Sequence, residues 1–172
     1  LMGEGISLAG MTETPAVIHL AQRPGPATGL PTRTEQGDLV LALHTGHGEF
    51  PRIILTPGSL EEAAELTARA FSLADRFQCP VIILTDQFLV QSYKTIDTLP
   101  LDTIDTKRRI VESTSRYRRY EHTPDNISPR SVPGFGAGLV LADSDEHDQE
   151  GRITESMEVR NKMQEKRLGK MK

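Results

Sequence analysis

Short apolar runs alternate along the chain with polar segments that are rich in glycine and proline. The runs at residues 16–21, 52–56 and 81–84 are dominated by Val, Ile and Leu. Their length and β-branched content are typical of buried strands. We therefore predict three strands at these positions.

Residues 59–77 have the clearest helical pattern. Ser59 is a favourable N-cap, and Glu62 completes a capping box with it. Apolar side chains recur at helical spacing and should form one face. They are Ala63, Leu66, Ala70, Leu73 and Phe77.

Other helices are expected at residues 1–11, as the end of a helix, and at 88–92. The apolar run at 39–43 is too short for its periodicity to separate a strand from a helix. If it is a helix ending at His44, Thr34 is a candidate cap. A last helix is predicted at 154–170, with Thr154 as its cap.

Strand, helix and strand follow one another, and each strand is apolar throughout. This order predicts an α/β fold, part of a doubly wound parallel sheet covered on both faces. We divide the chain into an α/β module (1–92), an extended arm or linker (93–153) and a C-terminal helix (154–172). The arm is rich in Asp, Thr and Arg, with a short strand expected at 139–141.

Residues 22–38, which follow the first predicted strand, contain three prolines and three glycines. That density excludes a helix or central strand and predicts a shaped loop. Arg23, Thr28 and Thr32 are its candidate binding residues, because ligands of open α/β sheets bind beyond the carboxyl ends of strands. A guanidinium there can hold a carboxylate or phosphate. The alternative is a surface loop whose arginines are solvated and whose threonines stabilise turns.

The composition of the chain argues against several classes of function. The formal net charge of −4 argues against a general binder of nucleic acid or anionic membranes. No apolar run approaches the roughly 20 residues that span a bilayer. A single cysteine, Cys79, excludes a disulfide framework and an iron–sulfur cluster held by this chain alone. It fits a cytoplasmic setting, and we expect it to be a buried small apolar residue.

Three other patterns favour structural roles. His44 and His47 flank a Gly-rich turn with no further ligand set nearby, so we expect loop packing or a subunit contact and no metal site. His147 stands among acidic residues, which indicates a hydrated loop. Residues 116–120 interleave arginine and tyrosine, a pattern we interpret as a partner-binding arm in preference to a nucleic-acid site.

Taken together, residues 12–15 (Thr-Glu-Thr-Pro), 22–39 and 46–52 resemble the α subunit of 2-oxoacid:ferredoxin oxidoreductases, the 2-oxoglutarate type in particular. The similarity continues through 80–91 and weakly to the end of the chain. It covers the whole chain but only part of the family's subunit. The chain therefore corresponds to a fragment, which we expect to be inactive by itself.

The resemblance implies the pyrimidine-binding module of thiamine diphosphate enzymes and the oxidative decarboxylation of a 2-oxoacid to acyl-CoA. It implies that Arg23 pairs with the substrate carboxylate and that Thr28 and Thr32 hydrogen-bond the 2-oxoacid. Coenzyme A is a substrate, and ferredoxin accepts the electrons. Thiamine diphosphate would be shared with a β subunit, which carries magnesium and an iron–sulfur cluster.

The family's thiamine-activating glutamate and a substrate threonine loop would lie upstream of residue 1, so no catalytic or metal residue is assigned to this chain. Two alternatives stay open. The substrate could be pyruvate or a branched-chain 2-oxoacid. The chain could instead be a non-catalytic α/β fragment that uses its Pro/Gly loop for subunit contact.

Overall fold

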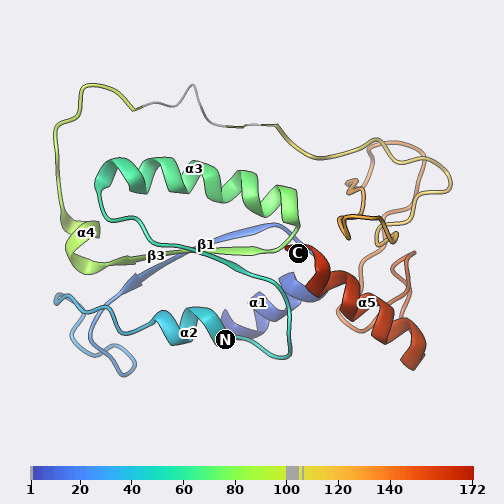
Figure 1. Ribbon diagram of the computed structural model, residues 1–172, viewed down its shortest axis with the longest axis horizontal. Helices are drawn as coiled ribbons and strands as arrows, with labels where there is room; N and C mark the ends of the chain where they lie inside the picture. Colours follow the sequence, from blue (N-terminus) through green and yellow to red (C-terminus); the bar gives the residue numbers. More distant parts are fainter. Residues whose placement is uncertain (1, 100–104, 106) are drawn as a thin grey trace.

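The chain folds around a small parallel sheet (Figure 1). The computed structural model describes residues 2–99, 105 and 107–172. In chain order, the elements are α1 (Met2–Met11), β1 (Ala16–Gln22), α2 (Leu39–His44), β2 (Ile53–Leu55), α3 (Leu60–Phe77), β3 (Pro80–Asp86), α4 (Gln87–Gln91) and α5 (Met157–Gly169). The sheet order is β1-β3-β2 with parallel pairs, so β3 is central. The predicted α/β fold is confirmed.

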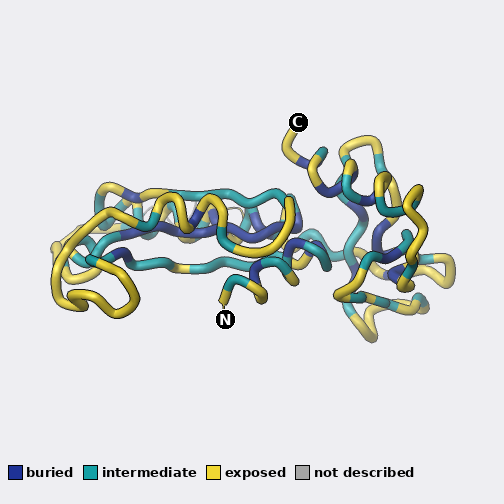
Figure 2. Tube along the Cα trace, turned by 90° about the horizontal axis from the view of Figure 1, so that it is seen from below, coloured by how far each residue is buried: buried dark blue, intermediate teal, exposed yellow. Residues whose placement is uncertain are grey.

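Alternate side chains of β3 form two separate cores. Val81 and Ile83 pack against the buried alanines of α3. Ile82 and Leu84 point to the opposite face and pack with Ala42 of α2. Because side chains alternate along a strand, a strand that is apolar throughout needs cover on both faces. Figure 2 shows buried stretches along the sheet and further buried stretches in the C-terminal part of the chain.

The predicted capping box of α3 is present. Ser59 Oγ accepts a hydrogen bond from the Glu62 N–H at 3.1 Å, and Glu62 Oε2 accepts from the Gly58 N–H at 2.7 Å. At the other end, Gln78 has left-handed backbone with φ 50° and ends the helix. This connection lets the chain turn directly into β3.

The run at 39–43, for which the sequence left strand and helix open, is helical, but its candidate cap Thr34 is wrong. The N-cap position of α2 is Asp38, which makes no side-chain capping bond. Thr34 lies too far upstream to cap this helix, and its Oγ1 instead accepts from the Phe88 N–H at 3.2 Å.

Two predictions in the C-terminal third are also wrong. Residues 139–141 form no strand, because this region pairs only through single bridges, such as Ser113 with Gly136, and builds no ladder. The last helix begins at Met157 with Ser156 as its cap, since Ser156 Oγ accepts from the Val159 N–H. Thr154, two residues before this cap, accepts a hydrogen bond from the Ser156 N–H through Oγ1.

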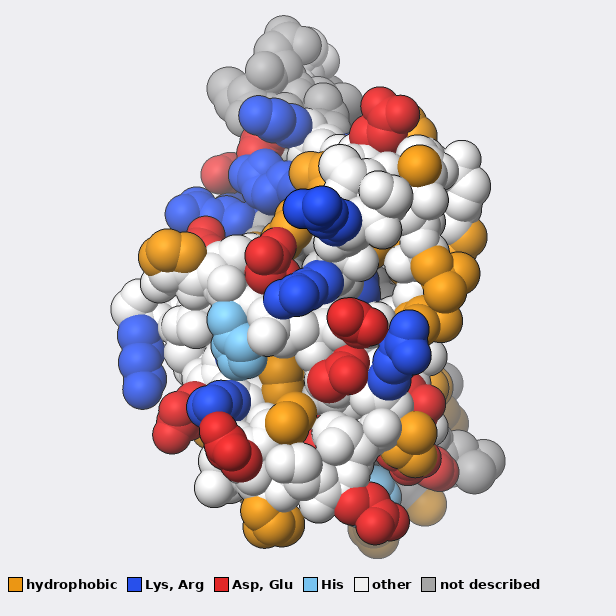
Figure 3. All heavy atoms as spheres, turned by 90° about the vertical axis from the view of Figure 1, so that its right-hand side faces the viewer, with side chains coloured by type: hydrophobic (Ala, Val, Ile, Leu, Met, Phe, Trp, Pro, Cys, Tyr) orange, Lys and Arg blue, Asp and Glu red, His pale blue; other side chains and the backbone are white. Residues whose placement is uncertain are grey.

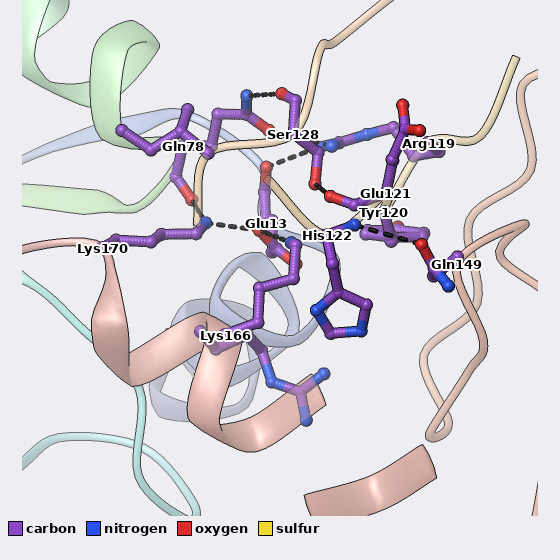
Figure 4. A network of polar contacts seen from close by, with 12 residues as sticks. Glu13, Gln78, Arg119, Tyr120, Glu121, His122, Ser128, Gln149, Lys166 and Lys170 are labelled. Carbon is purple, nitrogen blue, oxygen red and sulfur yellow. Dashed lines mark hydrogen bonds and ion pairs between the residues drawn. The ribbon is translucent and has the colours of Figure 1, made fainter. Parts of the chain in front are cut away.

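A buried charge cluster attaches the C-terminal segment to the sheet (Figure 4). Glu13, in the turn before β1, accepts hydrogen bonds from Lys166 Nζ at 2.6 and 2.8 Å and pairs with Lys170 Nζ at 2.5 Å. Arg119 donates to the Glu13 carbonyl at 2.7 Å and to Gln78 Oε1 at 2.8 Å. Residues from four distant parts of the chain therefore meet at the entrance to β1.

The structure corrects two interpretations of this segment. Arg119 and Tyr120 are buried within the chain, so these two members of 116–120 are not available to a partner. His147 is also buried, with its ring 4.0 Å from the Tyr120 ring, and burial lowers the pKa of its imidazole. Its acidic neighbour Glu146 accepts two hydrogen bonds from Arg167, at 2.9 and 2.7 Å. The interpretation of a hydrated acidic loop is therefore wrong for these two residues. The part of the predicted arm at 100–104 and 106 lies outside the described residues.

Surface charge on the side of the molecule shown in Figure 3 is mixed. Lys and Arg side chains are interspersed with Asp and Glu there, and no single basic patch stands apart. Among the described helices, none combines the length and the apolar character needed to cross a bilayer.

Candidate functional site

The carboxyl ends of the parallel strands meet at one edge of the sheet, which is where ligands bind in open α/β folds. Gln22 at the end of β1 pairs in register with Asp86 at the end of β3. A cleft of about 530 Å³ lies here. Its lining residues include Gln22, Gln36, Leu39, Thr56, Leu84, Thr85, Asp86 and Phe88.

Two hollows of similar or larger volume lie elsewhere. One, of about 600 Å³, runs between α3 and the start of β1, and the other, of about 800 Å³, lies beside the end of α5. Neither adjoins the loop that follows β1. Position at the strand ends, rather than size, therefore identifies the candidate site.

The loop after β1 folds back on itself around the Arg23 side chain. Arg23 Nε donates to the Thr28 carbonyl at 2.9 Å, and the Leu30 N–H donates to the Pro24 carbonyl at 3.0 Å. Gly29 has φ +53°, and a Cβ there would lie 1.7 Å from the Pro24 carbonyl oxygen. Only glycine fits this position without moving the backbone.

The three predicted binding residues share this loop. Arg23 is half-buried, while Thr28 and Thr32 are exposed. Within the described parts of the chain, no carboxylate forms a salt bridge with Arg23, and no hydrogen bond joins Thr32 to it. The structure thus brings Arg23 into contact with Thr28 through the backbone of Thr28, and Thr32 follows on the same exposed loop.

The second half of the loop is attached to the neighbouring strand ends. Three hydrogen bonds do this: Phe88 N–H to Thr34 Oγ1 at 3.2 Å, Gln36 Nε2 to Asp86 Oδ2 at 2.8 Å, and Asp38 N–H to Gln22 Oε1 at 2.9 Å. Sequence reasoning did not identify Gln36 or Asp86 as site residues. The available signal was the position of Asp86 at the carboxyl end of a buried strand.

Asp86 also begins the short helix α4. Its Oδ1 accepts from the Leu89 N–H at 2.8 Å. The Leu89 N–H and the Gln36 amide both stabilise the carboxylate and lower the pKa of Asp86. At neutral pH the cleft is therefore lined by one ionised carboxylate whose two oxygens are both engaged.

The other titratable candidates show no site chemistry. His44 and His47 are exposed, and no group of three potential ligands for a metal ion occurs in the residues that the structure describes. Cys79 is buried, as expected, and burial raises the pKa of its thiol to about 11. A thiol with that pKa is a poor nucleophile at neutral pH.

Comparison with known proteins gives consistent matches. Residues 1–166 match the family described as pyruvate flavodoxin/ferredoxin oxidoreductase, thiamine diphosphate-binding. The chain is 45% identical over 175 residues to the 2-oxoacid:ferredoxin oxidoreductase 1 subunit alpha of Sulfurisphaera tokodaii, covering 99% of this chain and 28% of that protein. It is 37% identical over 123 residues to the 2-oxoglutarate synthase subunit KorA of Archaeoglobus fulgidus, covering 72% and 36%.

A solved structure is similar over nearly the whole fold. It is the 2-oxoglutarate:ferredoxin oxidoreductase from Magnetococcus marinus with 2-oxoglutarate, coenzyme A and succinyl-CoA bound. The TM-score is 0.92 at 39% identity, covering 98% of this chain and 30% of that one. The chain thus spans less than a third of the length of this protein and of the Sulfurisphaera relative.

Proposed function

Because the chain belongs to the pyruvate flavodoxin/ferredoxin oxidoreductase family, as part of its thiamine diphosphate-binding domain, we propose that it is a segment of the α subunit of a 2-oxoacid:ferredoxin oxidoreductase. The enzyme converts a 2-oxoacid and coenzyme A to acyl-CoA and carbon dioxide, and two electrons pass to ferredoxin. Within this reaction, the segment binds the carboxylate of the 2-oxoacid.

One observation carries the proposal: among the described residues, the Arg23 side chain donates to the Thr28 carbonyl through Nε and makes no further hydrogen bond. Its two terminal guanidinium nitrogens can then donate to the two oxygens of a carboxylate. Such charge-assisted pairs are stronger than neutral hydrogen bonds and fix orientation. The hydroxyls of Thr28 and Thr32 donate to the remaining oxygens of the substrate, which holds the 2-oxo carbon in one position.

The cleft beside this loop suits part of the cofactor. Leu39, Leu84 and Phe88 provide apolar walls, and Gln22 and Thr85 provide polar groups. This combination fits a flat heteroaromatic ring such as the aminopyrimidine of thiamine diphosphate. When bound, thiamine diphosphate would supply the nucleophile for the 2-oxo carbon. We assign magnesium and the iron–sulfur cluster to a β subunit. This assignment agrees with the single cysteine of this chain, because a cluster needs several cysteines and this chain by itself cannot hold one.

The favoured substrate is 2-oxoglutarate, on the basis of the Archaeoglobus and Magnetococcus relatives. Pyruvate and branched-chain 2-oxoacids are the alternatives. Ferredoxin as acceptor and a free thiol at Cys79 both suit a cytoplasmic enzyme.

A subunit-interaction role is the second candidate function. It is favoured by α2, where Leu39, Val40, Leu41 and Leu43 are all largely exposed. Exposed apolar patches mark interaction surfaces. We assign this one to the β subunit, because the relatives are themselves named as alpha subunits. A Val40→Asp variant that no longer co-purifies with the β subunit would support this role, and an unchanged complex would exclude it.

The experiment that tests the enzymatic proposal uses the complete α subunit containing this chain, assembled with its β subunit. Reduction of ferredoxin or viologen is measured with coenzyme A and, in turn, 2-oxoglutarate, pyruvate and a branched-chain 2-oxoacid. We expect the highest kcat/KM with 2-oxoglutarate and no turnover by the 172-residue chain alone. An assembled enzyme that oxidises none of the three acids would overturn the proposal.

A further inference from the structure

The loop that carries Arg23 is attached at its far end by a side chain that reaches the neighbouring strand. We propose that Gln36 and Asp86 are positioning residues, whose hydrogen bond holds this loop in the geometry that binds the 2-oxoacid. We call this hydrogen bond the Gln36–Asp86 clasp. The inference rests on the proposed function and extends it to two residues that do not themselves contact the substrate.

The register of the sheet explains how the clasp works. The loop leaves β1 after Gln22, which lies opposite Asp86 in the β1–β3 ladder. It returns at Gln36, whose Nε2 lies 2.8 Å from Asp86 Oδ2. Both ends of residues 23–35 are therefore fixed at the same point of the sheet, and closing the loop there reduces the conformations that it can adopt.

The carboxylate of Asp86 is itself held in place. Oδ1 accepts from the Leu89 N–H at 2.8 Å, which caps α4, and Oδ2 is left for Gln36. The acceptor position is thus set by the buried strand and by the helix that follows it, not by the loop. The Gln36 side chain of the loop therefore donates to an acceptor whose position does not depend on the loop.

Two neighbouring residues attach the same part of the loop to the sheet. Residues 34, 36 and 38 each bond to a strand end or to α4. Glu35, between them, is exposed and makes no hydrogen bond to these strand ends among the described residues. Glu35 therefore provides a matched control on the same loop.

The test uses the complete α and β subunits and compares five variants. Gln36→Ala removes the clasp but keeps the cap of α4. We expect it to raise KM for the 2-oxoacid about tenfold, the size of one charge-assisted hydrogen bond. The KM for coenzyme A and the unfolding temperature should not change. Glu35→Ala should leave every value at that of the wild type.

Exchanging the amide of Gln36 and the carboxylate of Asp86 tests whether the two residues act as a pair or whether one of them acts by itself. Gln36→Glu places two carboxylates together and should also raise KM for the 2-oxoacid. Adding Asp86→Asn should recover most of that loss, because the introduced amide can donate to the introduced carboxylate while its oxygen still caps α4. Hydrogen exchange of the amides at 24–36 should rise in Gln36→Ala and return in the double variant.

The outcomes distinguish this inference from the proposed function. If Arg23→Ala raises KM but Gln36→Ala does not, the clasp has no positioning role. An equal rise in KM for coenzyme A, or a lower unfolding temperature, would make its role merely structural and overturn the inference. Failure of the double variant to recover would mean that Gln36 acts by itself. If neither Arg23→Ala nor Gln36→Ala changes KM for the 2-oxoacid, the proposed role of Arg23 is wrong, and the inference that rests on it is wrong as well.

Discussion

Lys166 Nζ lies 2.6 and 2.8 Å from the two carboxylate oxygens of Glu13, although the residues are 153 positions apart in the sequence. Both side chains are fully buried, at 0% exposure. The pair joins α5 to the turn that leads into β1. A carboxylate buried between two lysines can be stable, but removing one partner leaves an uncompensated charge out of water.

Glu13→Ala should therefore destabilise the protein strongly, by about 3–5 kcal/mol, since it leaves Lys166 and Lys170 buried without their counter-charge. Lys166→Met should cost less, because Lys170 still pairs with the carboxylate and methionine fills the space. Urea unfolding measures both. Lys162→Met, which breaks an exposed pair with Glu158, is the control and should cause no measurable change. Equal losses in all three variants would contradict this account.

The same carboxylate should make stability depend on pH. Burial alone would raise the pKa of Glu13, but the ammonium groups of Lys170 and Lys166 outweigh it and lower the pKa to about 2 from 4.5. The unfolded chain thus takes up the proton first. The stabilisation is complete above pH 4.5 and is lost as the pH falls toward 2, on the order of 3 kcal/mol in total.

Urea midpoints measured from pH 2 to pH 6 check this expectation. The wild type should lose stability across that window, and Glu13→Gln should lack this component of the slope. A Glu13→Gln variant with the same acid dependence as the wild type would show that other carboxylates are responsible.

Gly29→Ala should disrupt the loop that follows β1 and, with it, the substrate binding that we propose for Arg23. The new Cβ would lie 1.7 Å from the Pro24 carbonyl at a residue with φ +53°. The loop must shift, and a displacement of about 1 Å can cost up to a hundredfold in kcat/KM. In Gly37→Ala, the nearest atom to the new Cβ is the Glu35 side chain at 3.7 Å. Kinetics of the assembled enzyme should separate the two variants, and similar values for both would contradict the role of Gly29.

Cys79 should be unreactive in the folded protein. Its thiol is buried, and burial raises its pKa to about 11 although the charge of Lys170 opposes the shift. At pH 8 the thiolate that reacts with alkylating reagents is scarce and inaccessible. Mass spectrometry after iodoacetamide treatment should show labelling only once denaturant is added. Rapid labelling without denaturant would mean that the C-terminal segment opens readily.

Much of the sheet could be predicted from the sequence because its signals are local. Three short apolar runs predicted the strands, and Ser59 with Glu62 predicted the start of α3. The position of the loop after β1 followed from its prolines and glycines. The contact between Arg23 and the Thr28 carbonyl did not, since backbone acceptors in irregular loops have no sequence pattern.

The contacts that were missed join residues far apart in the chain. The Gln36–Asp86 clasp spans 50 positions and depends on strand register. His147 illustrates the same difficulty, because its acidic neighbours indicated a hydrated loop whereas Tyr120, from a distant loop, covers it. Local composition describes the sequence neighbours of a residue, but burial depends on which segments pack together.

The most direct test of the central claim is the kcat/KM of Arg23→Ala for 2-oxoglutarate in the complete α and β assembly. Arg69→Ala, an exposed arginine on α3, is the matched control. If Arg23 binds the substrate carboxylate, its loss should lower kcat/KM by about two orders of magnitude, while Arg69→Ala should equal the wild type. Unchanged kinetics in Arg23→Ala would mean that the loop is only scaffolding and that this chain does not anchor the 2-oxoacid.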